Sequence, residues 1–298
     1  MGGDFSVLQV GEFQDHVVEG LRKRFVLLEA PLAANLGAIR AIATTGKVEI
    51  GRQMISRLPR LEIISCLGAG CEGVDLEAAA ERDIEVTTTS RVLAADVADI
   101  AMGLILTMAR DLAGADRFVR AGHWTAGRYP LGTTLGGAWL GIVGLGNIGS
   151  ALARRAEAFD MKIAYHTRSP RRELSWHHMA DLTAMARQCR FLALCCPGGP
   201  ATHRLVSADI LRALGPDGYL INVARGSVVD EAALVEALET GGIAAAGLDV
   251  FQDEPRPHPG LIASPRAVLL PHIGSATLET RQRMAVAMIE AIERRAAR

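Results

Sequence analysis

The sequence predicts an α/β protein whose strands run parallel and fall into two sets. Short apolar runs alternate with longer segments of helical periodicity along the 298 residues, which is typical of parallel βαβ units. A glycine-rich turn, GLGNIG, follows one apolar run directly and opens a helical pattern, as in dinucleotide-binding units. No repeat, low-complexity tract or flexible linker interrupts the alternation.

The expected elements follow in chain order. The first set of strands consists of the apolar runs 5–10, 24–29, 41–45, 62–68 and 84–89. A helical pattern from Leu93 to Arg117 then predicts one long, largely buried helix that connects the two sets. The second set consists of the runs 139–146, 162–167, 191–196, 219–224, 244–250 and 267–274. A last helix is expected over Glu279–Arg295, and the two sets predict two domains, 1–91 with 277–298 and 92–276.

Charge and cysteine content exclude several classes of protein. The formal net charge is −1, from 32 basic and 33 acidic residues, so no footprint for nucleic acid or an anionic membrane is expected. Five cysteines without regular spacing indicate reduced packing thiols and no disulfide framework. The start of the chain lacks a signal-peptide pattern, and no window approaches 18 uninterrupted apolar residues. We therefore expect a cytoplasmic protein without a membrane span.

Two other chemistries find little support in the sequence. The two histidines of the run Trp176-His177-His178 suggest metal binding, but no cysteine or acid stands at matching spacing, so we expect a helix surface there and no metal site. The motif GxSxG is absent, which disfavours a serine hydrolase of that type.

The glycine turn has the properties of a phosphate cradle. Gly144 permits a tight turn, Gly146 lets backbone N–H groups approach a pyrophosphate, and Gly149 lets the next helix pack on the preceding strand. The N-terminus of that helix, at Asn147 and Ile148, favours the negative charge of the phosphates. A purely structural turn is the alternative.

The segment YHTRSP, about twenty residues further on, lacks the acid that usually holds a ribose hydroxyl. Arg168 stands there instead, between Thr167 and Ser169, with Arg171 and Arg172 close behind. An arginine and two hydroxyls suit a 2′-phosphate, which a carboxylate would repel. The segment therefore favours NADP(H) and leaves NAD(H) open; a solvated loop arginine is the structural alternative.

Four further polar residues follow apolar runs of the second set: Arg225, Asp249, Glu254 and His272. Because ligands of open parallel sheets bind at the carboxyl ends of strands, we expect these side chains to converge on the cofactor. Reduction of a 2-keto acid needs a cation for the carboxylate and a proton donor, which an arginine and a histidine supply. Glu254 would favour the imidazolium form and fix its orientation.

The motifs GLGNIG, NVARGSVVDEAAL, AAGLDVFQDEP and LLPHIGSATLETR, in this order, resemble those of the D-isomer-specific 2-hydroxyacid dehydrogenase family. Within it the chain is most similar to glyoxylate/hydroxypyruvate and hydroxyphenylpyruvate reductases. The resemblance implies two Rossmann-like/flavodoxin-like domains with an active-site cleft between a substrate domain and a dinucleotide-binding domain. It also implies an NADPH-dependent reductase of small 2-keto acids that forms D-2-hydroxy acids. A homodimer through the cofactor domains is implied as well, with residues 110–124 embracing the neighbour.

The resemblance also implies roles for individual residues. Arg225, Glu254 and His272 would be catalytic, with His272 as acid/base and Glu254 as its partner. Substrate would contact Leu67, Ala69, Gly70, Arg225, His272 and Ser275. The cofactor would contact Gly144, Gly146, Asn147, Ile148, Gly149, Thr167, Arg168, Ser169, Cys196, Pro197, Thr202, Val223, Ala224, Arg225, Asp249, His272 and Gly274.

Two alternatives stay open at this stage. One is an NAD-dependent dehydrogenase of the same family, which Arg168 disfavours. The other is a non-catalytic NAD(P)(H)-sensing protein like the corepressors of the family, which keep similar residues. Turnover of a keto acid separates an enzyme from a sensor.

Overall fold

The computed structural model describes residues 5–29 and 36–298, which form two compact units. The first unit comprises the described residues of Met1–Ala94 together with Ser275–Arg298, and the second comprises Ala95–Gly274. The sequence predicted a substrate domain of residues 1–91 together with 277–298, and a dinucleotide-binding domain of residues 92–276. This division into two functional domains remains a prediction.

The first unit is built on a five-stranded parallel sheet with the order β2-β1-β3-β4-β5, which is the flavodoxin-like order. All five strands were predicted, and their bounds are β1 Ser6–Val10, β2 Val26–Glu29, β3 Ile39–Thr44, β4 Ile63–Cys66 and β5 Glu85–Thr88. The helices are α1 Asp15–Arg22, α2 Arg52–Ser56, α3 Leu76–Ala80 and α11 Leu278–Ala296, with a 3₁₀ turn at η1 Leu36–Ala38.

Alternation along β1 assigns the two faces of this sheet. Val7 belongs to a core shared with α1 and α11, through Leu21 and Met288. The next residue, Leu8, belongs to the core on the other face, which includes Ile55 of α2 and Ala79 of α3. Successive side chains of a strand point to opposite faces, so helices cover both sides of the sheet.

The second unit contains a seven-stranded parallel sheet with the order β12-β11-β10-β9-β6-β7-β8. Its strands are β6 Trp139–Val143, β7 Lys162–His166, β8 His177–His178, β9 Phe191–Leu194, β10 Tyr219–Asn222, β11 Ala245–Leu248 and β12 Ala267–Leu269. The strand order reverses between β6 and β9, which is the Rossmann switch point where ligands bind in such sheets.

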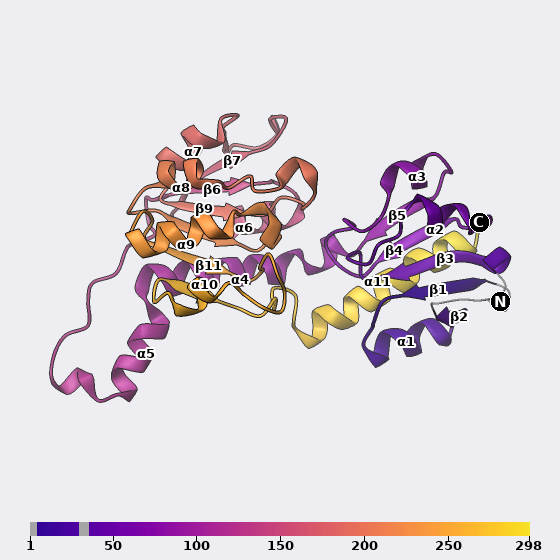
Figure 1. Cartoon of the computed structure of the whole chain (residues 1–298), viewed down its shortest axis with the longest axis horizontal. Helices are drawn as coiled ribbons and strands as arrows, with labels where there is room; N and C mark the ends of the chain where they lie inside the picture. Colours follow the sequence, from indigo (N-terminus) through magenta and orange to yellow (C-terminus); the bar gives the residue numbers. More distant parts are fainter. Residues whose placement is uncertain (1–4, 30–35) are drawn as a thin grey trace. The chain divides into compact units, whose positions relative to one another are not determined.

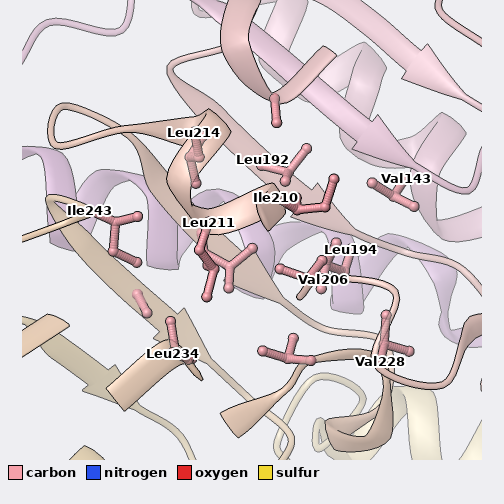
Figure 2. Close-up of a cluster of buried hydrophobic side chains, with 14 of the residues drawn as sticks. Val143, Leu192, Leu194, Val206, Ile210, Leu211, Leu214, Val228, Leu234 and Ile243 are labelled. Carbon is pink, nitrogen blue, oxygen red and sulfur yellow. The ribbon is translucent and has the colours of Figure 1, made fainter. Parts of the chain in front are cut away.

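Helices cover both faces of the second sheet (Figure 1). The helices of this part of the chain are α4 Ser90–Arg110, α5 Leu112–Arg120, α6 Asn147–Glu157, α7 Leu182–Gln188, α8 Ala208–Leu214, α9 Glu231–Thr240 and α10 Pro259–Ala263, with 3₁₀ turns η2 His123–Thr125, η3 Pro200–Thr202 and η4 Gly226–Val228. Of these helices, α5 has no buried residue and extends away from the sheet (Figure 1). An ion pair of 2.5 Å between Asp99 of α4 and Arg155 of α6 joins two helices of one face. Leu192 and Leu194 of β9 pack with Leu211 of α8 and Leu234 of α9 in a core on the other (Figure 2).

Two predictions about local structure were wrong. The expected single helix from Leu93 to Arg117 is broken at Asp111, which adopts the left-handed conformation and begins α5 by accepting a hydrogen bond from the Gly114 N–H. His177 and His178, expected on a helix surface, form the edge strand β8 beside β7. Asp tolerates left-handed backbone, and an edge strand of two residues carries no periodicity that a sequence pattern would reveal.

One helix in the described part of the chain, α4, is long and apolar enough to cross a membrane by length and composition alone, with a mean hydropathy of 1.9. More than half of its apolar window is buried inside the protein. Leu104 and Met108 of α4 pack where a side chain on Gly247 of β11 would otherwise lie. These contacts are typical of a core helix that covers a sheet.

Candidate active site

The predicted site residues of the second unit follow neighbouring strands and therefore lie along one edge of its sheet. In spatial order, His272 follows β12, Asp249 and Glu254 follow β11, and Arg225 follows β10. Cys196 then follows β9, the glycine turn follows β6, and Arg168 follows β7. Because all these strands are parallel, the sheet itself brings together residues that are separated by more than 100 positions in the chain.

The glycine turn has the predicted geometry. Gly144 has a φ of 91°, and a Cβ there would lie 2.6 Å from the Cα of Cys196. A Cβ on Gly149 would overlap the Gly144 carbonyl, so the start of α6 packs closely on the turn. Gly146 is the N-cap of α6 and has open space where a side chain would be. An exposed helix N-terminus without a side-chain cap fits a pyrophosphate.

The loop after β7 is tied to this turn by Arg171. The Arg171 guanidinium donates through Nη1 to the Leu145 carbonyl at 3.0 Å and through Nε to Glu173 at 2.7 Å. The Arg171 backbone N–H also donates to the hydroxyl of buried Tyr165, at 2.8 Å. Arg171 therefore braces the cradle, a contact that the sequence did not reveal.

Arg168 itself is exposed, as is Ser169, whereas Thr167 is half-buried. The Thr167 hydroxyl donates to the Ser169 carbonyl at 2.7 Å and so orders the turn that presents Arg168. The nearby carboxylate of Glu173 is ion-paired with Arg171. Arg168 is therefore available to a ligand, whereas Arg171 is engaged in the fold.

The segment after β9 begins with a buried thiol and continues as a partly exposed loop. Cys196 is buried in the core of the second unit, where burial raises the pKa of its thiol to about 11. The Thr202 hydroxyl donates to the carbonyl of Pro197 at 2.7 Å. The thiol is thus uncharged near neutral pH, and the loop Cys196–Thr202 is closed by its own hydrogen bond.

Glu254 and His272 form a hydrogen-bonded pair. Nδ1 of His272 lies 3.0 Å from Oε1 and 2.9 Å from Oε2 of Glu254. About a third of the imidazole side chain and a quarter of the carboxylate side chain are exposed. A carboxylate on Nδ1 fixes the tautomer and leaves Nε2 to face a reacting group.

His272 adopts left-handed backbone, with a φ of 55°, which costs free energy in a residue other than glycine. Asp249 holds this turn. Its Oδ1 accepts the Ile273 N–H at 2.7 Å, and its Oδ2 accepts the Gly274 N–H at 2.8 Å. Burial raises the pKa of Asp249, although the two N–H groups and His272 act against that rise. The resemblance assigned Asp249 to the cofactor, and the structure adds a role in orienting His272.

Arg225 begins a turn that Asn222 organises. The Asn222 Nδ2 donates to the Arg225 carbonyl at 2.9 Å, and its Oδ1 accepts the Ala224 N–H at 3.0 Å. Arg225 is half-buried and donates through Nη1 to the Ala224 carbonyl at 2.7 Å. Val223 and Ala224 are buried beneath it. Asn222 was missed because a single Asn at the end of an apolar run is an ordinary strand end.

The remaining predicted substrate residues belong to the first unit. Leu67, Ala69 and Gly70 lie in the half-buried loop after β4, where the Leu67 N–H donates to Thr44 at 2.7 Å. Gly46 packs so closely on the Gly70 carbonyl that a Cβ would overlap it. Ser275 follows Gly274 at the junction of the two units. The hydrogen bond of Leu67 and the close approach of Gly46 therefore hold the loop after β4 against the end of β3.

Comparisons with known proteins identify the family. Residues 102–274 match the family model described as D-isomer specific 2-hydroxyacid dehydrogenase, NAD binding domain. A 2-ketogluconate reductase of Gluconobacter oxydans is 43% identical over 96% of this chain and 93% of its own length. A glyoxylate/hydroxypyruvate reductase of Arabidopsis thaliana is 39% identical over 97% of this chain and 95% of its own.

Among solved structures, an NADPH-dependent glyoxylate/hydroxypyruvate reductase from Sinorhizobium meliloti, in complex with NADP and malonate, has a TM-score of 0.89 and 41% identity. The match covers 97% of this chain and 93% of that one. Family, fold and cofactor class therefore agree over nearly the whole length of the protein. The chain belongs to the D-isomer-specific 2-hydroxyacid dehydrogenase family, as an NAD(P)-dependent enzyme that reduces 2-keto acids.

Proposed function

We propose that this protein is an NADPH-dependent reductase of glyoxylate, hydroxypyruvate and similar small 2-keto acids, and that it forms D-2-hydroxy acids. The observation that carries the proposal is the pair of Glu254 and His272, with Nδ1 of the ring 2.9 Å from the carboxylate. General acid catalysis needs such a group within reach of the substrate. The pair supports an enzyme, whereas turnover of a keto acid is what separates an enzyme from a sensor with similar residues.

Each residue then has a chemical task. Bound NADPH would supply the hydride that reduces the carbonyl carbon of the keto acid. Nε2 of His272 delivers the proton to the oxygen, while Glu254 stabilises the imidazolium and holds the ring. Arg225 binds the substrate carboxylate with its guanidinium fork.

The preference for NADPH rests on the loop after β7. Arg168 is exposed and follows Thr167, and the carboxylate of Glu173, five positions further on, is engaged by Arg171 at 2.7 Å. A 2′-phosphate gains charge-assisted hydrogen bonds from such a loop. The Sinorhizobium relative at 41% identity carries NADP, which supports the same assignment.

The decisive test is the loss of NADPH near-ultraviolet absorbance with a panel of keto acids that includes glyoxylate, hydroxypyruvate, hydroxyphenylpyruvate and 2-ketogluconate. Each acid is assayed with both cofactors, and the chirality of the product is determined. We expect turnover with glyoxylate or hydroxypyruvate and a higher kcat/KM with NADPH than with NADH. Tight NADPH binding without turnover of any acid would favour the sensor, and preference for NADH would favour the NAD-dependent relative.

We further propose that the protein acts as a cytoplasmic homodimer through its second unit. The segment from α5 to Leu131 extends away from the sheet of that unit (Figure 1). None of the residues of α5 is buried, and Leu112, Val119, Trp124 and Leu131 are all exposed. Tyr129 closes the segment through a hydrogen bond to Asp111 and an edge contact with Phe118. An ordered apolar surface of this kind is typical of an interface.

A further inference from the structure

Two acidic side chains are buried among the described residues, Asp249 and Glu231. Asp249 follows β11 and holds the turn of His272, as described above. Glu231 lies at the start of α9 and is 7% exposed. A buried carboxylate costs free energy unless hydrogen bonds offset it. What Glu231 binds therefore indicates why it is buried.

Glu231 is not the cap of its own helix. Asp230 is the N-cap of α9 and accepts the Ala233 N–H at 3.3 Å. Oε1 of Glu231 instead accepts the backbone N–H of Gln252, which lies 21 positions further along the chain in the loop after β11. Its bond thus joins α9 to the loop that carries Glu254.

The same peptide is held from a second side. A Cβ on Gly226 would overlap the carbonyl of Phe251, so the turn after Arg225 lies in close contact with the Phe251–Gln252 peptide. Phe251 is itself buried in the core of the second unit. This peptide is therefore fixed by its contact with Gly226, by the burial of the Phe251 ring and by the hydrogen bond that Glu231 accepts from the Gln252 N–H.

Phe251 also contacts the acid/base pair of Glu254 and His272 through its backbone N–H. The Phe251 N–H donates to Oε1 of Glu254 at 3.3 Å, and Glu254 contacts Nδ1 of His272. The Phe251 N–H belongs to the preceding peptide, which shares the Cα of Phe251 with the anchored one, so a shift of the Phe251 backbone would move the donor that holds Glu254. Burial is the largest influence on the pKa of the Glu231 carboxyl and raises it. Of the charged groups nearby, His258 lowers this pKa and Asp253 raises it.

We propose that Glu231 is a positioning residue for the acid/base pair: it anchors the Phe251–Gln252 peptide, and through it the Glu254 carboxylate that orients His272. This inference rests on the proposed function for its catalytic readout. It predicts that loss of the Glu231 acceptor slows the chemical step and leaves binding of NADPH and substrate unchanged.

The test compares Glu231→Leu, which keeps volume but accepts no hydrogen bond, with Glu231→Gln, whose amide oxygen still accepts the Gln252 N–H. Glu236→Ala, on an exposed position of the same helix, is the matched control. For each folded variant we would measure kcat and KM for hydroxypyruvate, the Kd of NADPH, and the NMR signals of the His272 ring nitrogens, assigned by comparison with His272→Gln.

We expect Glu231→Leu to lower kcat by about 10–100-fold, as misplacement of a catalytic group does, with KM and Kd within about twofold of the wild type. Its Nδ1–H signal should shift or broaden as the bond to Glu254 loosens. Glu231→Gln and Glu236→Ala should retain both the rate and the signal. If Glu231→Leu does not fold, Glu231→Asp takes its place, because it shortens the side chain by one methylene. Glu231→Asp should show a smaller fall in kcat and a smaller change of the Nδ1–H signal.

Wild-type kcat and an unchanged ring signal in a folded Glu231→Leu or Glu231→Asp protein would overturn the inference. So would an equal loss in Glu231→Gln or Glu236→Ala. The ring signal decides the matter even if no keto acid is turned over, a result that would defeat the proposed function alone.

Discussion

Nδ1 of His272 lies 2.9 Å from Oε2 of Glu254. The two residues are joined although they are 18 positions apart and follow different strands, β12 and β11. Asp249 fixes the backbone beneath this pair by accepting both N–H groups after His272. The fold therefore sets the orientation of the imidazole, as the proposed role of His272 as proton donor requires.

Replacement of His272 should remove proton transfer without removing the cofactor site. We expect His272→Ala to lower kcat by about 10²–10⁴-fold, because the variant loses general acid catalysis by the imidazole. NADPH fluorescence titration should give a Kd close to that of the wild type. A rate close to that of the wild type would contradict the acid/base assignment.

Replacement of Glu254 by Gln should have a smaller effect of the same kind. The amide still reaches Nδ1, but it removes the negative charge that favours the imidazolium. We expect a fall in kcat that is smaller than in His272→Ala, with little change in KM for hydroxypyruvate. Steady-state kinetics with saturating NADPH measure both quantities, and a fall in kcat as large as in His272→Ala would contradict this ranking.

Arg168 should distinguish the two cofactors. A hydrogen bond to a charged group contributes about 1.5–3 kcal/mol, so Arg168→Ala should raise the Kd of NADPH by roughly 10–100-fold and leave that of NADH almost unchanged. Arg187→Ala, which removes an exposed arginine of α7, is the control. Equal losses for both cofactors would defeat the assignment of the 2′-phosphate.

The first unit should lose stability in acid through Glu62. The carboxylate of Glu62 lies 2.6 Å from Arg40 of β3 and 3.3 Å from Arg295 of α11. The hydrogen bond from Arg40 is the main reason that the pKa of Glu62 is lowered. A lowered folded-state pKa means that the unfolded chain binds the proton first. The stabilisation is then present above the unfolded pKa of about 4.3 and is lost as pH falls through the folded value.

Glu62→Gln should therefore lower the free energy of unfolding at pH 7 by about 1 kcal/mol, with a smaller difference from the wild type as pH falls below about 4. Urea unfolding at several pH values measures this. Glu81→Gln removes the exposed pair with Arg52 and should leave the unfolding midpoint nearly unchanged. A difference for Glu62→Gln that grows in acid would contradict the sign of the effect.

The exposed apolar surface of the α5 segment predicts the oligomeric state. Val119 and Trp124 are 52% and 70% exposed, and charges placed there would have to be buried in a dimer. We expect the wild type to be dimeric in light scattering and the double variant Val119→Lys/Trp124→Lys to be monomeric. Leu76→Lys, at a position of the first unit that is 51% exposed, is the control. A monomeric wild type would contradict the homodimer.

The sequence predicted the fold where its periodicity was strong. The five strands of the first unit and the run FLAL of β9 are apolar, short and bounded by turn residues, so they were confirmed as parallel strands. It failed at Asp111, where helical periodicity continues through a residue that leaves the helix. The Tyr129 hydroxyl donates to the Asp111 carboxylate, and no pattern within a helix reports a partner 18 residues away.

The sequence by itself determined the chemical types at the edge of the second sheet: the glycines of the turn, Arg168 in place of an acid, and the order of Arg225, Glu254 and His272. Only the tertiary structure decided how these groups are held. Asn222 at the Arg225 turn, Asp249 beneath His272 and Glu231 behind the Glu254 loop all act through backbone N–H or C=O groups. Nearly every residue carries these backbone groups, so the side chain that binds a given group is decided by how the chain folds. The sequence around that group does not reveal its partner.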